Sequence, residues 1–226
     1  MKICAISDLH GYLPKIEPCE LVLICGDIVS LKCQQYHHSC KKWYLKKFKP
    51  WVESLPCEKA LFIPGNHECG VEGHEIEYRN MFPHSYKATI LIHEEYEYLS
   101  NEGKIYKVFG TPYCKIFGNW AFMRENETLK EKFSEIPEEL DILMTHDAPY
   151  GCNDICVDPT TWNTFEHLGN IPLREMILEK TPKLVLHGHL HSSLHEFESL
   201  GKSKVINCSI KNENYEPTYS PLLLDI

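Results

Sequence analysis

Short apolar runs that end in aspartate, glycine or histidine recur along the whole chain. They cover residues 2–7, 21–25, 60–63, 142–145 and 184–186. Near-continuous apolar runs of this length, bounded by turn residues, predict strands that helices bury on both faces. Functional side chains in such sheets lie just beyond the carboxyl ends of the strands. All five runs are followed there by polar residues.

Three segments between these runs carry helical patterns, strongest at 40–55 and weaker at 125–133 and 173–180. The aromatic residues of 40–55 recur at helical spacing with lysines around them, so we expect an aromatic face against the core and solvated lysines. A nucleic-acid or membrane surface is the alternative for this segment.

Alternating apolar and polar residues predict a hairpin over 88–110, a second one over 194–206, and a closing strand at 222–226. The chain shows no internal repeat, low-complexity tract or linker-like stretch. Buried strands that alternate with helices, together with these hairpins, predict an α/β fold: a four-layer α/β/β/α sandwich of two mixed β-sheets flanked by helices. We expect one domain over residues 1–226.

Composition and charge narrow the class of partner. The 226 residues are 43% hydrophobic and 24% charged, which is ordinary for a globular protein and argues against disorder. The net charge of −9 argues against attraction to a nucleic-acid polymer or an anionic membrane. The only arginines are Arg79, Arg124 and Arg174, so a phosphate clamp of several arginines is not available.

The 11 cysteines are odd in number and lack CxxC spacing. The chain shows no secretory signal pattern, and no apolar run approaches the ~20 residues that span a bilayer. We therefore expect reduced thiols, many of them in the core, in a cytoplasmic protein that does not enter a membrane. A disulfide framework is the alternative.

Polar side chains with metal-binding chemistry stand at the five predicted strand ends. They are Asp8, His10, Asp27, Asn66, His67, His146, His189 and His191. Carboxylate oxygens and imidazole nitrogens without thiolates suit divalent metals such as Mn, Fe, Zn or Co. Asp8 and His10 are two residues apart, as are His189 and His191, so in an extended chain both members of a pair point the same way. Each residue alone fits an ordinary turn, but the full set, in order at five strand ends, predicts a metal site.

The order of these residues is similar to that of a known family. Asp8-x-His10, Gly26-Asp27, Gly65-Asn66-His67-Glu68, His146 and Gly188-His189-x-His191 match the five motifs of the calcineurin-like metallophosphoesterases. The stretches 109–113, 145–151, 206–209 and 214–215 further resemble the fetal-brain-type branch, known for cyclic-nucleotide phosphodiesterases. The resemblance covers essentially the whole chain.

Two departures from the family pattern are mild, because neither removes a ligand. The usual Gly-Asp-x-x-x-x-Gly lacks its last glycine, since Gly26-Asp27 continues to Ser30-Leu31-Lys32. His146 is followed by Asp147-Ala148 where Gly-Pro is commoner. Asp147 could therefore alter the charge near the substrate.

The resemblance implies a dinuclear metal centre. One ion would be held by Asp8, His10, Asp27 and His191, and the other by Asp27, Asn66, His146 and His189, with Asp27 as the bridge. Two cations about 3.5–4 Å apart bind the phosphate and lower the pKa of a bridging water, so that hydroxide attacks the phosphorus in line with the leaving oxygen. His67 would face the phosphate as a cation or a general acid, and Glu68 would orient His67. Mn is the favoured metal, with Fe, Zn, Co or Mg as alternatives.

The resemblance also implies a metal-dependent phosphoric ester hydrolase. The acidic charge and few arginines count against long polyanions, so the leading substrate is a small phosphodiester or nucleotide, such as a cyclic nucleotide. A phosphomonoesterase or protein phosphatase with the same centre is the alternative. A non-catalytic scaffold of the same fold is disfavoured, because such members lack ligands that this chain retains. Tyr113, Trp120 and Trp162 are candidates to stack on a base, and packing roles are the alternative. The sequence does not indicate an oligomeric state.

Overall fold

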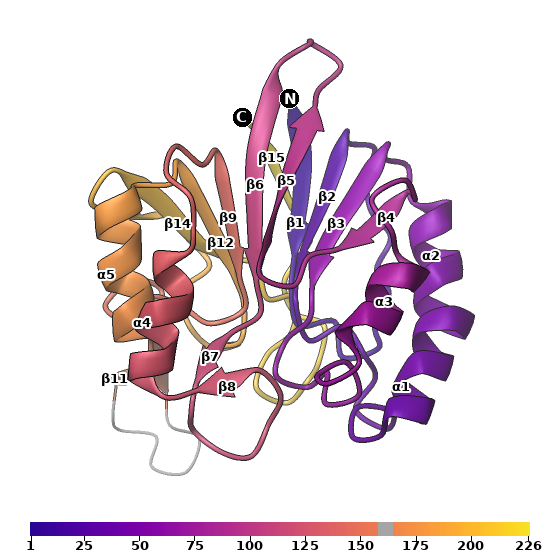
Figure 1. Cartoon of the computed structure of the whole chain (residues 1–226), viewed down its shortest axis with the longest axis horizontal. Helices are drawn as coiled ribbons and strands as arrows, with labels where there is room; N and C mark the ends of the chain where they lie inside the picture. Colours follow the sequence, from indigo (N-terminus) through magenta and orange to yellow (C-terminus); the bar gives the residue numbers. More distant parts are fainter. Residues whose placement is uncertain (158–164) are drawn as a thin grey trace.

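The computed structural model describes residues 1–157 and 165–226 and contains two mixed β-sheets (Figure 1). The first sheet has the strand order β15-β1-β2-β3-β4, in which β1 to β4 are parallel and β15 pairs antiparallel with β1. Its strands are β1 (Lys2–Ile6), β2 (Leu21–Cys25), β3 (Lys59–Ile63), β4 (Ala88–Ile90) and β15 (Leu222–Asp225).

The second sheet has the order β13-β14-β12-β9-β6-β5. Its four inner strands are parallel, and the edge strands β13 and β5 pair antiparallel with their neighbours. The strands are β5 (Glu94–Leu99), β6 (Ile105–Thr111), β9 (Ile142–Thr145), β12 (Leu184–His187), β13 (Glu198–Leu200) and β14 (Ser203–Asn207).

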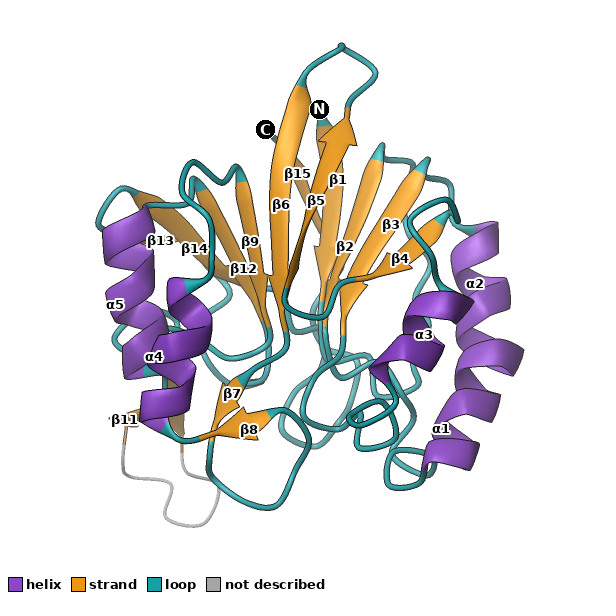
Figure 2. Ribbon diagram, in the orientation of Figure 1, coloured by secondary structure: helices purple, strands orange, loops and turns teal. Residues whose placement is uncertain are grey.

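Helices cover the outer face of each sheet, as Figure 2 shows. On the first sheet lie α1 (His37–Trp43), a π-helical segment η1 (Tyr44–Phe48), α2 (Lys49–Ser54) and α3 (Glu75–Met81). On the second lie α4 (Asn126–Ser134) and α5 (Ile171–Lys180). The predicted four-layer α/β/β/α sandwich is therefore confirmed.

Both faces of the central strands are buried, which explains their near-continuous apolar sequence. Along β1, Ile3 and Ala5 point into the core between the two sheets, whereas Cys4 and Ile6 join the core beneath the helices of the first sheet. A third core, which includes Leu129 of α4, lies between the second sheet and its helices.

Most predicted elements appear near their expected bounds. The helix expected over 40–55 is the continuous run α1-η1-α2, and its aromatic face is buried as predicted, with Tyr44 and Phe48 fully inaccessible. The hairpin expected over 194–206 is β13–β14, and the closing strand is β15. Helix α3 carries a mostly polar sequence, and the sequence patterns missed it.

The hairpin expected over 88–110 is wrong at its start. Residues 88–90 form β4, which pairs with β3 in the first sheet, and only β5 and β6 form the hairpin. All three residues of β4 are buried, so this short apolar segment belongs to the first sheet's core rather than to the alternating pattern that follows. Periodicity alone did not show where one sheet ends and the other begins.

Short strand pairs and loops complete the described structure. The pairs are β7 (Cys114–Lys115) with β8 (Met123–Arg124), and β10 (Ile155–Val157) with β11 (Phe165–His167). The ten cysteines whose side chains are described are all free thiols, as expected. None of the helices in this part of the chain is long and apolar enough to span a bilayer. The extent of the domain, residues 1–226, stays a prediction.

Candidate metal centre

The predicted ligands follow five strands whose carboxyl ends lie at one edge of the two sheets. Asp8 follows β1, Asp27 follows β2 and Asn66 follows β3 in the first sheet. His146 follows β9, and His189 and His191 follow β12 in the second sheet. Parallel strands present their carboxyl ends at the same edge, so residues far apart in sequence meet between the sheets.

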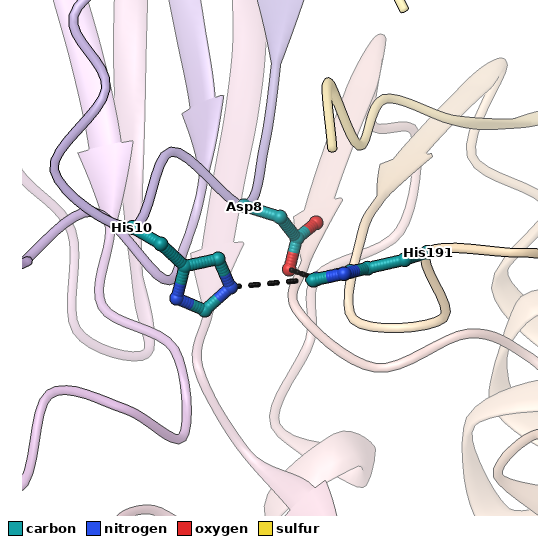
Figure 3. Close-up of side chains that lie close together, drawn as sticks. All are labelled: Asp8, His10 and His191. Carbon is teal, nitrogen blue, oxygen red and sulfur yellow. Dashed lines mark hydrogen bonds and ion pairs between the residues drawn. The ribbon is translucent and has the colours of Figure 1, made fainter. Parts of the chain in front are cut away.

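One cluster of side chains joins the first sheet to the second. Figure 3 shows Asp8, His10 and His191 converging, with the Nε2 atoms of the two histidines 3.3 Å apart. Oδ1 of Asp8 lies 3.3 Å from Nε2 of His191. All three side chains are buried, and one candidate ligand atom from each lies within 4.8 Å of the others.

Asp27 links this cluster to a second one. Its Oδ1 lies 3.3 Å from Nε2 of His146, whereas its Oδ2 lies 3.6 Å from Nε2 of His10. Nε2 of His146 in turn lies 2.9 Å from Oδ1 of Asn66. The two carboxylate oxygens thus face two different sets of ligands, which is the arrangement that a bridging carboxylate requires.

His189 and His67 occupy the border of these clusters. The ring of His189 lies 5.1 Å from the ring of His146, measured between centroids, and its backbone N–H donates to the carboxylate of Asp8. Nε2 of His67 lies 3.7 Å from Oδ2 of Asp27, close enough that distance alone does not separate a ligand from a residue facing the substrate. The separate role of His67 stays a prediction.

Left-handed backbone conformations aim several of the ligands. The φ angles of Asp8, His10, Asp27 and His189 are 59°, 42°, 52° and 70°. The extended-chain argument for the pair Asp8 and His10 is therefore wrong, because both residues turn in the left-handed region instead of continuing the strand. Such conformations are strained for residues other than glycine and cluster at functional sites.

Close backbone approach explains a glycine of the last motif. A side chain at Gly188 would overlap the hydroxyl of Ser7 and the carboxylate of Asp8. The turn after β12 can therefore lie directly against the turn after β1 only because residue 188 has no Cβ. This approach places the backbone N–H of His189 within hydrogen-bond distance, 3.0 Å, of Oδ2 of Asp8.

Glu68 supports the site in a different way from the one predicted. Its buried carboxylate accepts hydrogen bonds from the backbone N–H groups of Gly65, Asp27, Ile28 and Val29, at 2.6–3.0 Å. It therefore fixes the turn that carries Asp27 against the turn that carries Asn66, rather than orienting the His67 ring. The ring contacts Gln34 instead: Nδ1 of His67 lies 2.5 Å from Oε1 of Gln34, a partner that the sequence patterns did not single out.

Asp147, one of the departures from the family pattern, is fully buried. Its carboxylate accepts hydrogen bonds from the backbone N–H groups of Lys115 and Ala148 and from the side chain of Asn170, at 2.9–3.0 Å. The carboxylate is thus engaged in holding neighbouring loops together. Burial lowers the pKa of His189, and the charge of the Asp147 carboxylate opposes this shift. The expectation that Asp147 alters the charge near the substrate stays a prediction.

The carboxylates and imidazoles of the site perturb each other. Burial raises the pKa of Asp8 and Asp27, but His191 and His146 more than offset it and hold both carboxyl pKa values below their usual range. Burial lowers the pKa of His146 and His191, yet the facing carboxylates raise these pKa values to about 10 and about 9. The pKa of His10 falls to about 4, mainly through burial.

This donor set fits divalent metal ions. It consists of carboxylate oxygens, an amide oxygen and imidazole nitrogens, without thiolates, gathered in a buried space. A cation would replace the protons that His146 and His191 retain against Asp27 and Asp8, so metal binding should release protons. The ligands Asp8, His10, Asp27 and His191 would hold one ion, and Asp27, Asn66, His146 and His189 the other.

Aromatic side chains surround this centre. The ring of Trp120 packs on the ring of His67 at 4.5 Å, Phe117 on His189 at 5.1 Å, and Tyr215 on His10 at 4.8 Å, measured between centroids. Phe117 and Tyr215 are missing from the aromatic residues expected at the site. Tyr113 instead packs against Phe122, His93 and Lys132, which is a structural role. Trp162 lies outside the described residues.

The fold and this site define a class, the calcineurin-like phosphoesterases. The model of that family matches residues 1–193, and the chain belongs to the family. It is therefore a metallophosphoesterase, a phosphoester hydrolase, and its candidate metal ligands lie at the edge of its two sheets.

Individual relatives agree with this assignment. The chain is 27% identical over 246 residues to metallophosphoesterase domain-containing protein 1 of Homo sapiens, covering 100% of this chain and 71% of the relative. It is also 27% identical over 243 residues to a UPF0046 protein of Caenorhabditis elegans, covering 100% of this chain and 81% of the relative.

Solved structures share the fold at low sequence identity. TT1561 of Thermus thermophilus matches with a TM-score of 0.58 and 15% identity over 91% of this chain and 88% of that one. The phosphopantetheinyl hydrolase of Mycobacterium tuberculosis matches with a TM-score of 0.56 and 12% identity over 95% and 90% of the two chains.

Proposed function

We propose that this protein hydrolyses a small phosphodiester, such as a cyclic nucleotide, with the help of two divalent metal ions. The observation that carries the proposal is the position of Asp27. One carboxylate oxygen faces His146, and the other faces His10. A carboxylate between two sets of ligands is what a two-metal centre needs.

The chain's own residues divide the work. The ligands fix the positions of two ions, which when bound would neutralise charge on the phosphate and activate a water molecule for attack. Asp8 and Asp27 supply the negative charge that retains the ions in a buried site. His67, at the border of the site, would donate a proton to the leaving oxygen from Nε2, the nitrogen that faces Asp27 at 3.7 Å.

Two features support a small diester. Each arginine is engaged elsewhere: Arg79 with Glu94, Arg124 with Glu72, and Arg174 with the backbone of Tyr150. A phosphomonoester carries more charge than a diester and would gain from such cations. The aromatic rings of Phe117, Trp120 and Tyr215 instead offer stacking surfaces for the organic part of a substrate, such as a nucleobase.

The metal and the cellular location are part of the same proposal. Mn is our first choice, because carboxylate, amide and imidazole ligands without thiolates suit it; Fe, Zn, Co and Mg are the alternatives. The free thiols of the described cysteines support a reducing compartment, so we propose a cytoplasmic protein without a membrane or nucleic-acid polymer as partner.

Hydrolysis assays under each metal test the proposal. Bis(p-nitrophenyl) phosphate and a panel of cyclic nucleotides should be hydrolysed faster than p-nitrophenyl phosphate and a phosphopeptide. Faster hydrolysis of the last two would favour the phosphomonoesterase or protein phosphatase alternative. Bound metal without turnover of any of these esters would favour a scaffold.

A further inference from the structure

The two ring nitrogens of His67 have different neighbours. Nε2 faces the carboxylate of Asp27 at 3.7 Å, on the side of the metal ligands. Nδ1 lies 2.5 Å from Oε1 of Gln34. An amide oxygen can only accept a hydrogen bond, so Nδ1 carries a hydrogen and donates it to Gln34. The partner of Nδ1 fixes both the tautomer and the rotation of the ring.

The remaining sides of the ring are also held. Trp120 packs on its face with centroids 4.5 Å apart and planes at 33°, and His10 meets it edge-on at 4.8 Å. The loop of Trp120 is anchored to the same turn as His67, because the N–H of Ala121 donates to the carbonyl of Asn66 at 3.1 Å. Packing thus limits movement of the ring, but within residues 1–157 and 165–226 the directional partner of Nδ1 is Gln34.

The segment that carries Gln34 is itself fixed. It follows Asp27 directly and is the stretch in which the chain lacks the family's last glycine. The carboxylate of Glu68 binds the N–H of Val29 at 2.7 Å, and the N–H of Cys33 donates to the carbonyl of Ser30 at 2.8 Å. Gln34 is half-buried, whereas its neighbour Gln35 is exposed. The loop is therefore built to present residue 34 to the site.

We propose that Gln34 is a positioning residue for His67, holding Nδ1–H so that Nε2 points at the leaving oxygen of the substrate. This inference rests on the function proposed above. In the step, oxygen from water bonds to phosphorus and the bond to the leaving oxygen breaks. The leaving oxygen takes a proton from Nε2, while the other ring hydrogen stays on Nδ1 and is donated to Oε1 of Gln34. His67 regains its proton from solvent, and the attacking water loses one to solvent.

Paired substrates that differ only in their leaving group test this role. Methyl phenyl phosphate needs a proton on its leaving oxygen more than methyl p-nitrophenyl phosphate does. Gln34→Met keeps the length of the side chain but replaces the amide oxygen with a thioether sulfur, a much weaker acceptor. We expect kcat on methyl phenyl phosphate to fall about 10- to 100-fold in the metal-loaded variant, because misaligned catalytic groups lose rate on this scale. The loss on methyl p-nitrophenyl phosphate should be much smaller, and KM should change little.

Matched variants separate positioning from general damage. Gln35→Met changes the exposed neighbour of the same type and should leave both rates unchanged. Gln34→Glu keeps an acceptor oxygen, so its rate on methyl phenyl phosphate should lie close to that of the parent protein and well above that of Gln34→Met. Elemental analysis should find the same metal content in all variants. NMR of the histidine ring nitrogens should show the hydrogen-bonded Nδ1–H of His67 in the parent protein and its loss in Gln34→Met.

A double variant completes the test. If Gln34 acts through His67, adding Gln34→Met to His67→Ala should cause no further loss. Equal losses on both substrates, additive losses in the double variant, or an unchanged rate in Gln34→Met would each overturn the proposal. If His67→Ala itself fails to discriminate between the leaving groups, the proposed general acid is wrong. If His67→Ala loses more rate on methyl phenyl phosphate than on methyl p-nitrophenyl phosphate and Gln34→Met does not, only the role of Gln34 is wrong.

Discussion

The space between the two sheets contains two buried regions with opposite chemistry. Along most of the strands it is filled by aliphatic side chains, among them Ile3 of β1, Leu23 of β2 and Leu186 of β12. Just beyond the carboxyl ends of the same strands it is filled by carboxylates and imidazoles, beginning with Asp8 and Asp27. Both regions are buried and belong to the same strands, but the aliphatic region contributes to stability and the polar region to function.

The difference is one of stability against function. Burying a large aliphatic side chain stabilises a fold by about 1.5–3 kcal/mol, whereas burying a charge costs several kcal/mol unless a partner compensates it. The site compensates with facing charges, as the lowered carboxyl pKa values of Asp8 and Asp27 show, and is ready to accept cations. We therefore expect substitutions in the aliphatic region to change stability, and substitutions at the strand ends to change metal content and rate.

The largest effect is expected for Asp27→Ala. Because its oxygens face both clusters, removing the carboxylate should abolish binding of both metal ions and reduce hydrolysis to background. Elemental analysis of the purified variant checks this. Asp225→Ala, at an exposed position on β15, is the control and should keep both ions. Retention of two ions by Asp27→Ala would show that Asp27 is not the bridge.

His67→Ala should separate chemistry from metal binding. We expect the variant to keep its metals and to lose about 10²–10⁴-fold in turnover on a nucleotide substrate with an alkoxide leaving group. The loss should be smaller on bis(p-nitrophenyl) phosphate, whose phenolate leaves readily. An equal loss on both would indicate that His67 stabilises charge on the phosphate rather than donating a proton. Loss of metal would make it a ligand.

In the aliphatic region the effect should fall on stability. Leu23 is fully buried between the sheets, so Leu23→Ala should lower the free energy of unfolding by about 2–5 kcal/mol. Urea denaturation with excess metal measures the change. Leu223→Ala, on the half-exposed face of β15, should cost far less. The folded Leu23→Ala protein should still bind two ions, and loss of metal would mean that the two regions are not separable.

The smallest effect is expected on the stability of the metal-free, chelated protein as the pH rises. The pKa values of His146 and His191 are raised to about 10 and about 9 by Asp27 and Asp8, above the value of about 6.5 expected for an unfolded chain. This contribution to stability is complete below the unfolded pKa and is lost as pH rises through the folded values. The free energy of unfolding should therefore fall between about pH 7 and about pH 10.

Metal should remove this alkaline dependence, because ligand histidines bind a cation without their protons. Denaturation midpoints at neutral and alkaline pH, with chelator and with metal, make the comparison. The same alkaline fall in both samples would show that the protonated histidines and the metal do not compete for one site.

The sequence predicted the sandwich and the chemistry of its edge because both depend on local patterns. A strand buried on two faces must be apolar along its length, as Leu21–Cys25 is, and the residue after it is free to be polar. Asp27, Asn66 and His146 could be singled out in this way without knowing which strands were neighbours. Sequence patterns could not show that the first sheet ends at β4. A short apolar segment such as β4 has the same sequence pattern whether it pairs with the first sheet or with the second.

Tertiary structure decided how these residues meet. The sequence suggested that Asp8 and His10 converge through an extended chain, but left-handed turns bring them together. It suggested that Glu68 orients His67, but the folded chain gives Glu68 four backbone partners and gives His67 the side chain of Gln34. Local sequence fixes which groups are polar and where strands end, whereas partners distant in sequence are chosen only when the sheets pack and each buried donor and acceptor must be satisfied.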